Sequence, residues 1–145
     1  MSVDVPTFLI CDNHVWVARL TKWRLEKLFG KGIAVILGHS GEDAINLFQT
    51  IVRTGQHHNL QLILLGCHMP VCTGMQAAAG IRCIEQNNSI SRPVEIVGTT
   101  TDLNDEVYLE FIQAGANIVL AKPVPEGELE EVCSEIVSRK DFGDV

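Results

Sequence analysis

Three side chains that could do chemistry stand at the ends of short apolar runs. Asp12, Thr100 and Lys122 each follow or close such a run, and Gly66 ends a fourth one. An aspartate can hold a metal ion, a lysine can neutralise an anion, and a hydroxyl group can hydrogen-bond to one. If the runs are parallel strands, their carboxyl ends meet at the edge where open α/β sheets bind ligands. The sequence therefore predicts one pocket containing all four positions, although Asp12 and Lys122 could also be ordinary solvated residues.

Short apolar runs alternate with longer amphipathic segments along the whole chain. The predicted strands are 8–11, 33–37, 60–65, 94–97 and 118–121, and the predicted helices are 15–29, 41–53, 75–86, 103–113 and 126–138. Continuous apolar strands are typical of a sheet covered on both faces. Five strand–helix units imply right-handed crossovers and a parallel sheet. We therefore predict an α/β, flavodoxin-like, three-layer, doubly wound fold with strand order 2-1-3-4-5.

Length and composition favour one compact domain. The chain has 145 residues, of which 46% are hydrophobic and 20% charged. This length can bury roughly two thirds of the unfolded surface, which is enough for one core. We expect a single domain over 1–145, with its core at about 6–138 and frayed tails. No linker or repeat divides it.

Charge and cysteine content narrow the functional class. The net charge of −7 argues against nucleic-acid binding, which needs a basic face, and is compatible with a basic protein partner. The chain has no apolar run of about 18 residues and no secretory signal, so a membrane span is not expected. Its five cysteines lack a paired spacing and are expected to stay reduced, in the cytoplasm or the nucleus.

Several motifs around these positions resemble the response-regulator receiver domain. They are the strand 62–66 that continues into Met69-Pro70 and Gly74, the triplet 114–116 (Ala-Gly-Ala), and Lys122-Pro123. The resemblance covers nearly the whole chain. A weaker similarity links it to the stand-alone response regulators of plants and to the receiver domains of hybrid kinases.

The resemblance implies a site that has lost its acidic half. Gly66 stands where the family keeps the aspartate that becomes phosphorylated, and Cys11 replaces the first of two adjacent acids, while Asp12 matches the second. A glycine offers neither a nucleophile nor a metal ligand. Asp12 and the backbone of His68 are the remaining candidates for Mg²⁺, so we expect magnesium binding to be weak or absent and no other cofactor.

The other half of the site is largely kept. Thr100 and Lys122 match the hydroxyl residue and the lysine that contact the phosphoryl group in active members of the family. Val119 stands where the family has a Tyr or Phe that rotates on activation. The vestigial pocket thus comprises Cys11, Asp12, Thr100, Val119 and Lys122.

Two functions remain open. The favoured one is a non-enzymatic pseudo-receiver, which binds proteins of a histidine-to-aspartate phosphorelay without accepting the phosphoryl group. The alternative is a receiver that is phosphorylated on an unconventional acceptor such as Cys67 or His68. A thiol or an imidazole needs an activating neighbour to act as a nucleophile, and the sequence identifies none.

Two tryptophans mark the first predicted helix. Trp16 and Trp23 are seven residues apart, so they share a helix face, either packed against the fifth helix or exposed as anchors for a partner. The resemblance implies that this helix docks a histidine-containing phosphotransfer protein or a sensor histidine kinase, with Trp16, Val17, Leu20 and Trp23 in the contact. Val17, Leu20, Arg24 and Leu28 fall near helical spacing, and Leu25 widens this predicted stripe.

Overall fold

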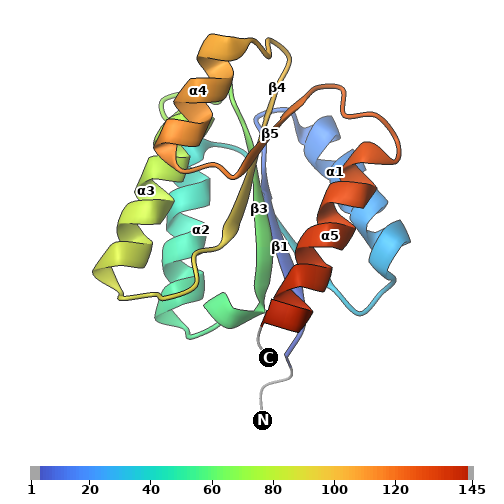
Figure 1. Cartoon of the computed structure of the whole chain (residues 1–145), viewed down its shortest axis with the longest axis vertical. Coiled ribbons are helices and arrows are strands. Elements are labelled where there is room, and N and C mark those ends of the chain that lie inside the picture. The colour runs from blue at the N-terminus through green and yellow to red at the C-terminus, as the bar shows by residue number, and fades with distance from the viewer. Residues whose placement is uncertain (1–3, 144–145) are drawn as a thin grey trace.

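The computed structural model describes residues 4–143 and consists of five strands and five main helices within that range (Figure 1). The strands are β1 (Thr7–Cys11), β2 (Ala34–Gly38), β3 (Leu60–Gly66), β4 (Glu95–Thr100) and β5 (Ile118–Ala121). The helices are α1 (Val15–Phe29), α2 (Gly41–Arg53), α3 (Gly74–Asn87), α4 (Asp105–Ala114) and α5 (Glu128–Gly143), with a 3-10 turn, η1 (His57–Asn59), before β3.

The five strands form one parallel sheet in the order β2-β1-β3-β4-β5. Helices α1 and α5 cover one face, and α2, α3 and α4 cover the other (Figure 1). The predicted three-layer fold and strand order are therefore confirmed. The chain crosses from one face to the other around the neighbours β1 and β3, and this switch point is where such folds bind ligands.

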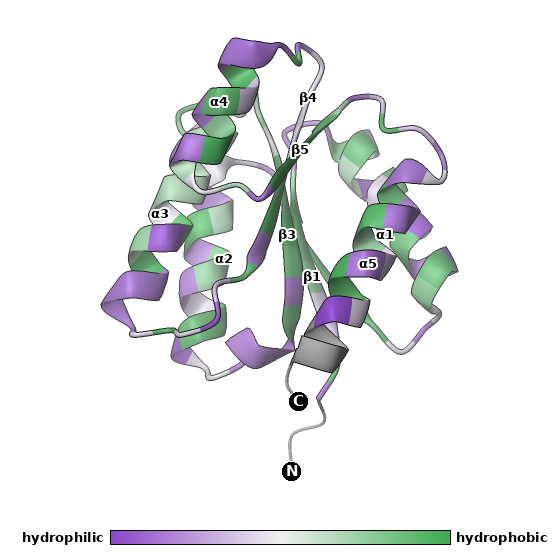
Figure 2. Cartoon of the chain, in the orientation of Figure 1, coloured by the Kyte–Doolittle hydropathy of each residue, from purple (hydrophilic) through white to green (hydrophobic). Residues whose placement is uncertain are grey.

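A separate hydrophobic core fills each face of the sheet. Every residue of β3 is buried, and the side chains of residues 62–65 alternate between the two cores because successive strand residues point to opposite faces. Leu65 packs in the core that contains Phe48 and Phe111, whereas Leu64 packs in the core that contains Leu25 and Leu129. Figure 2 shows the resulting band of hydrophobic residues along the central strands.

Side-chain caps set where three helices begin. The Ser40 hydroxyl accepts a hydrogen bond from the backbone of α2, and the Asn104 side chain does the same for α4. Thr73 and Gln76 form a reciprocal capping box at the start of α3. These caps satisfy backbone N–H groups that a helix leaves unpaired. The three caps also fix the last residues of the loops that follow β2, β3 and β4.

The buried face of α1 differs from the predicted stripe. Ala18 and Leu25 are its fully buried residues, while Val17, Leu20 and Leu28 are exposed. The prediction was wrong for these three because small Ala18, rather than a large residue, lies against the sheet. Helix α5 also continues to Gly143, beyond its predicted end. Residues 1–3 and 144–145, part of the predicted frayed tails, lie outside the described residues.

No helix in residues 4–143 is both long and apolar enough to cross a membrane.

Candidate functional site

An ion pair joins the carboxyl ends of β1 and β5. Lys122 Nζ donates a hydrogen bond to Asp12 Oδ2, and both side chains are largely buried. The other carboxylate oxygen, Asp12 Oδ1, accepts from the backbone N–H of His14 at 2.9 Å. Both oxygens of Asp12 therefore already have a hydrogen-bond donor. A buried carboxylate is stable only with such partners.

Gly66 faces this ion pair from the end of β3. A Cβ atom placed on Gly66 would lie 3.0 Å from Asp12 Oδ2 and 3.4 Å from Lys122 Nζ. A side chain at position 66 would thus compete for Lys122 and crowd the carboxylate of Asp12. The structure brings Asp12, Gly66 and Lys122 together at the edge where the strand ends meet, as the sequence predicts.

Thr100 does not line the cavity beside the ion pair, although its carbonyl oxygen accepts a hydrogen bond from the backbone N–H of Lys122 at 2.8 Å. Gly66 pairs in register with Thr99, and Thr99 and Thr101 line the cavity beside Asp12 and Lys122. The Thr100 side chain is 1% exposed, and its hydroxyl accepts from the backbone N–H of Asp102 at 3.1 Å. Because neighbouring strand residues alternate in direction, a one-residue difference decides which threonine reaches this cavity.

Cys11 and Val119 belong to the hydrophobic core on the α2–α4 side of the sheet. Burial, reinforced by the carboxylate of Asp43, raises the pKa of the Cys11 thiol to about 12. The thiol therefore stays protonated and carries no charge that could replace the missing acid. Val119 packs in the same core near Phe111. Cys11 also lines the cavity beside Asp12 and Lys122, whereas Val119 is not among the residues that line it.

The residues at this edge do not fit a magnesium ion. Magnesium requires octahedral oxygen ligands, usually including one or two carboxylates. Asp12 is occupied by Lys122 and the N–H of His14, Gly66 has no ligand atom, and Cys11 offers a buried thiol. Residues 4–143 contain no group of three or more His, Cys, Asp or Glu that could hold a metal.

The two residues after Gly66 differ in their surroundings. Cys67 is 2% exposed, its Sγ lies 3.6 Å from Met75 Sδ, and burial raises the pKa of its thiol despite a hydrogen bond with Thr100. His68 is exposed, and its Nε2 lies 3.2 Å from Asp102 Oδ2. Cys67 is therefore a buried, protonated thiol, and His68 points to the surface loop after β4.

Phe111 is a site neighbour that the sequence did not identify. A Cβ atom on Gly98 would come within 2.8 Å of the Phe111 ring, and one on Gly74 would lie 2.9 Å from the ring and 2.2 Å from the carbonyl oxygen of Gly66. The two glycines leave the space that the ring fills. Phe111 thereby connects α4 with the β3–α3 connection next to Gly66. The glycines within β4 and at the start of α3 were the signal for this packing.

A cavity of about 260 Å³ opens beside the ion pair, between α1 and the β5–α5 connection. Apolar side chains from both sheet and helices form most of its wall, including Ile10, Val17, Leu20, Leu64 and Leu129. Asp12, His14 and Lys122 also line it. Val17 and Leu20, two of the predicted partner contacts, thus lie at the rim of the predicted site.

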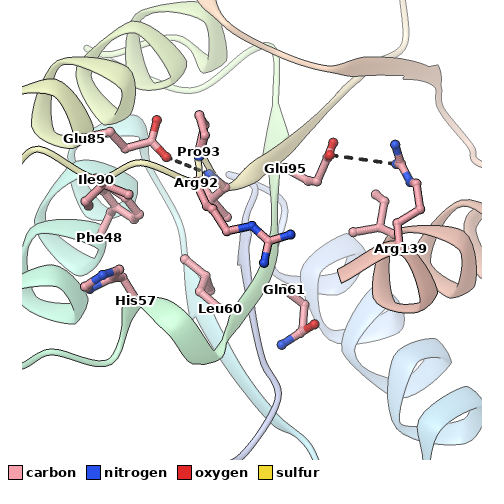
Figure 3. Close-up of a pocket in the computed structure, with 12 residues that line it drawn as sticks. Phe48, His57, Leu60, Gln61, Glu85, Ile90, Arg92, Pro93, Glu95 and Arg139 are labelled. Carbon is pink, nitrogen blue, oxygen red and sulfur yellow. Dashed lines mark hydrogen bonds and ion pairs between the residues drawn. The ribbon is translucent and has the colours of Figure 1, made fainter. Parts of the chain in front are cut away.

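A second hollow lies at the opposite end of the sheet (Figure 3). It has a volume of about 140 Å³ and is lined by Glu85, Arg92, Glu95 and Arg139 among others. Its charges are mixed, since Arg139 lies 3.8 Å from Glu95, and Glu85 accepts from the backbone N–H of Val94 at 2.7 Å. It is far from the strand ends that carry Asp12 and Lys122, so we do not assign it to the same site.

The outward face of α1 is apolar. Trp16 is 80% exposed, and Leu20 and Trp23 are each 55% exposed. Spacings of four and three residues place these side chains in one ridge along the helix. Lys27 extends the ridge, with its Nζ 5.0 Å from the centre of the Trp23 ring. Of the two interpretations of the tryptophans, exposure favours a contact surface over packing against α5.

Comparison with known proteins points to one family. Residues 8–134 match the family model described as the response regulator receiver domain. The chain is 26% identical over 129 residues to the peroxide stress-activated histidine kinase mak2 of Schizosaccharomyces pombe, covering 89% of this chain and 5% of that kinase. It is 34% identical over 140 residues to the autoinducer 2 sensor kinase/phosphatase LuxQ of Vibrio parahaemolyticus, covering 94% of this chain and 14% of that protein. The chain thus spans a small fraction of these relatives.

Solved structures give the same picture. One match is a chain in the co-crystal structure of the histidine phosphotransfer protein Ypd1 and the receiver domain of Ssk1 from Saccharomyces cerevisiae. Its TM-score is 0.78 at 25% identity, and the match covers 97% of this chain and 94% of that one. The receiver domain of the histidine kinase CKI1 from Arabidopsis thaliana, complexed with Mg²⁺ and BeF₃⁻, matches with a TM-score of 0.76 and 26% identity, covering 92% and 90%.

Proposed function

Because this chain belongs to the response-regulator receiver domain family, we propose that it serves two-component signalling as a pseudo-receiver. In this role it binds a partner protein and accepts no phosphoryl group. The observation that carries the proposal is the position of Gly66, whose missing side chain faces Asp12 and Lys122. Those two residues neutralise each other, and position 66 offers no carboxylate to attack phosphorus.

The partner surface we propose is the ridge of Trp16, Leu20 and Trp23, with Val17 at its edge. Tryptophan is enriched among the residues that contribute most to binding. A histidine-containing phosphotransfer protein or a sensor histidine kinase is the proposed partner. The similarity to a receiver crystallised with a histidine phosphotransfer protein supports this class of partner.

The alternative acceptors are less consistent with the geometry. Cys67 is buried with a raised thiol pKa, so little of it would be thiolate at neutral pH, and the thiolate is the nucleophile. His68 has only the exposed carboxylate of Asp102 beside it. Incubation with a small-molecule phosphodonor, followed by intact-mass measurement, tests both, and a stable phosphoryl adduct would favour the alternative.

Beryllofluoride provides the direct test of the proposal. It mimics an aspartyl phosphate and needs a carboxylate oxygen to attach to. We expect wild-type protein to show no saturable, magnesium-dependent change in amide chemical shifts when it is titrated with beryllofluoride. The Gly66→Asp variant restores a carboxylate and is the matched positive control. A wild-type response equal to that of the variant would contradict the proposal.

A further inference from the structure

The charge of this acidic chain is distributed unevenly. Residues 19–31 contain five positive side chains and one negative one, although the whole chain has a net charge of −7. Arg24 forms an ion pair with Glu130 of α5. Arg19 and Lys27 remain exposed beside the tryptophan ridge. The outer face of α1 is therefore both basic and apolar, which the net charge of the chain conceals.

The outer face of α4 has the opposite charge. No lysine or arginine occurs between 93 and 121, whereas Asp105, Glu106 and Glu110 are all exposed on α4. Leu109 lies among these carboxylates and is 53% exposed, and Tyr108 is exposed beside them. In the described part of the chain, α4 thus presents an acidic face around exposed apolar residues.

We propose that copies of this chain associate head to tail, with the α1 face of one copy docked on the α4 face of the next. Arg19 and Lys27 would meet Asp105 and Glu106, while the tryptophan ridge would cover Leu109. Symmetric pairings are disfavoured because α1 against α1 would oppose cations and α4 against α4 would oppose carboxylates. Opposite charge and exposed apolar surface on both faces favour the unlike pairing.

The two faces lie on opposite sides of the sheet (Figure 1). One docking event therefore leaves a free α1 face at one end of the pair and a free α4 face at the other. Such a heterologous contact forms a ring if its rotation closes and an open chain otherwise. The contact also covers the α1 ridge that the proposed phosphotransfer partner uses, so self-association and partner docking would compete. It does not depend on that partner, and it can be measured with the chain alone.

Sedimentation velocity on three proteins tests this association. We expect the average molecular mass of the wild-type protein to rise with its concentration up to about 0.1 mM. The association constant should fall at least about threefold when the ionic strength rises from about 0.03 M to about 0.3 M, because salt screens surface charges. The α1 variant, Arg19→Glu/Lys27→Glu, and the α4 variant, Asp105→Lys/Glu106→Lys, should each be monomeric alone. An equimolar mixture should associate again, because the intact α4 face of the α1 variant can dock on the intact α1 face of the α4 variant.

Arg53→Glu is the matched control, because Arg53 is an exposed cation on another helix and its reversal should leave association unchanged. Circular dichroism confirms that each variant is folded. A wild-type chain that stays monomeric at low ionic strength, or folded variants that do not associate when mixed, would overturn the proposal. Binding of the wild-type monomer to phosphatidylserine vesicles through α1 would also overturn the proposal, because the α1 face would then contact a lipid surface and not a second copy of the chain.

Discussion

Arg24 of α1 donates two hydrogen bonds of 2.9 Å to Glu130 of α5, from Nε to Oε2 and from Nη2 to Oε1. The same guanidinium donates to the carbonyl oxygens of Val124 and Pro125 at 2.9 and 2.8 Å. One arginine therefore fixes α1, α5 and the connection that follows Lys122. Fork-shaped pairs of this kind combine charge with defined geometry.

This contact predicts an acid-dependent loss of stability. The hydrogen bonds from Arg24 lower the pKa of Glu130 from 4.5 to about 2. A lowered folded-state pKa contributes stability above the unfolded value, and this contribution is lost as pH falls toward the folded value. We expect the difference in unfolding free energy between wild type and Glu130→Gln to be constant above about pH 5.5 and to shrink between pH 4.5 and about 2. Urea denaturation at several pH values measures this difference.

Glu135→Gln, at an exposed site on the same helix, is the control. A difference between wild type and Glu130→Gln that does not vary with pH would contradict the assignment of the low pKa to Glu130.

Restoring a carboxylate at position 66 should destabilise the fold without magnesium. In Gly66→Asp the new charge would lie beside Asp12, because the Cβ alone would be 3.0 Å from its Oδ2. Lys122 offsets part of the repulsion, so we expect a net loss of about 1 kcal/mol at neutral pH. Magnesium should recover part of this loss because it binds the folded state. Thermal melts with and without magnesium measure both effects.

Gly66→Asn separates charge from shape in that experiment. Asparagine has nearly the same size as aspartate but no charge. The variant should therefore lose stability through crowding at position 66, and magnesium should recover less of this loss than in Gly66→Asp. If magnesium stabilises wild type as much as Gly66→Asp, position 66 is not the lost ligand position.

Gly98 and Phe111 should be energetically coupled. Phe111→Ala should cost about 3–5 kcal/mol, as for other buried aromatic residues. Gly98→Ala should cost about 1–3 kcal/mol, because the added Cβ would approach the ring to 2.8 Å. In a Phe111→Leu background, the same glycine substitution should cost less. Chemical denaturation of the four proteins gives the coupling energy, and strictly additive effects would show that the ring does not restrict Gly98.

The tryptophan ridge should contribute to partner binding more than to folding. Trp16→Ala and Trp23→Ala should each weaken binding to the phosphotransfer partner by about 1–3 kcal/mol. Thermal stability should change little, because both side chains are largely exposed. Isothermal titration calorimetry measures the affinity, and Leu28→Ala, on the flank of the same helix, is the control. Unchanged affinity in both tryptophan variants would place the interface elsewhere.

The sequence by itself determined the fold. Continuous apolar runs such as 60–65 belong to strands covered on both faces, and five strand–helix units leave few topologies open. It also placed Gly66, Asp12 and Lys122 at the same edge of the sheet, because parallel strands end at one edge. These features depend on periodicity and chain order, which are local properties of the sequence.

Only the tertiary structure decided which neighbouring side chain reaches each space. Adjacent strand residues point to opposite faces, so Thr99 lines the cavity while Thr100 is buried beside Cys67. The placement of Phe111 depends on glycines distant from it in the chain. On α1 the sequence left open whether the tryptophans are packed or exposed, and the structure buries small Ala18 and Leu25 while Trp16 and Trp23 stay exposed. Packing between distant segments decides such choices, and no periodicity in the sequence records them.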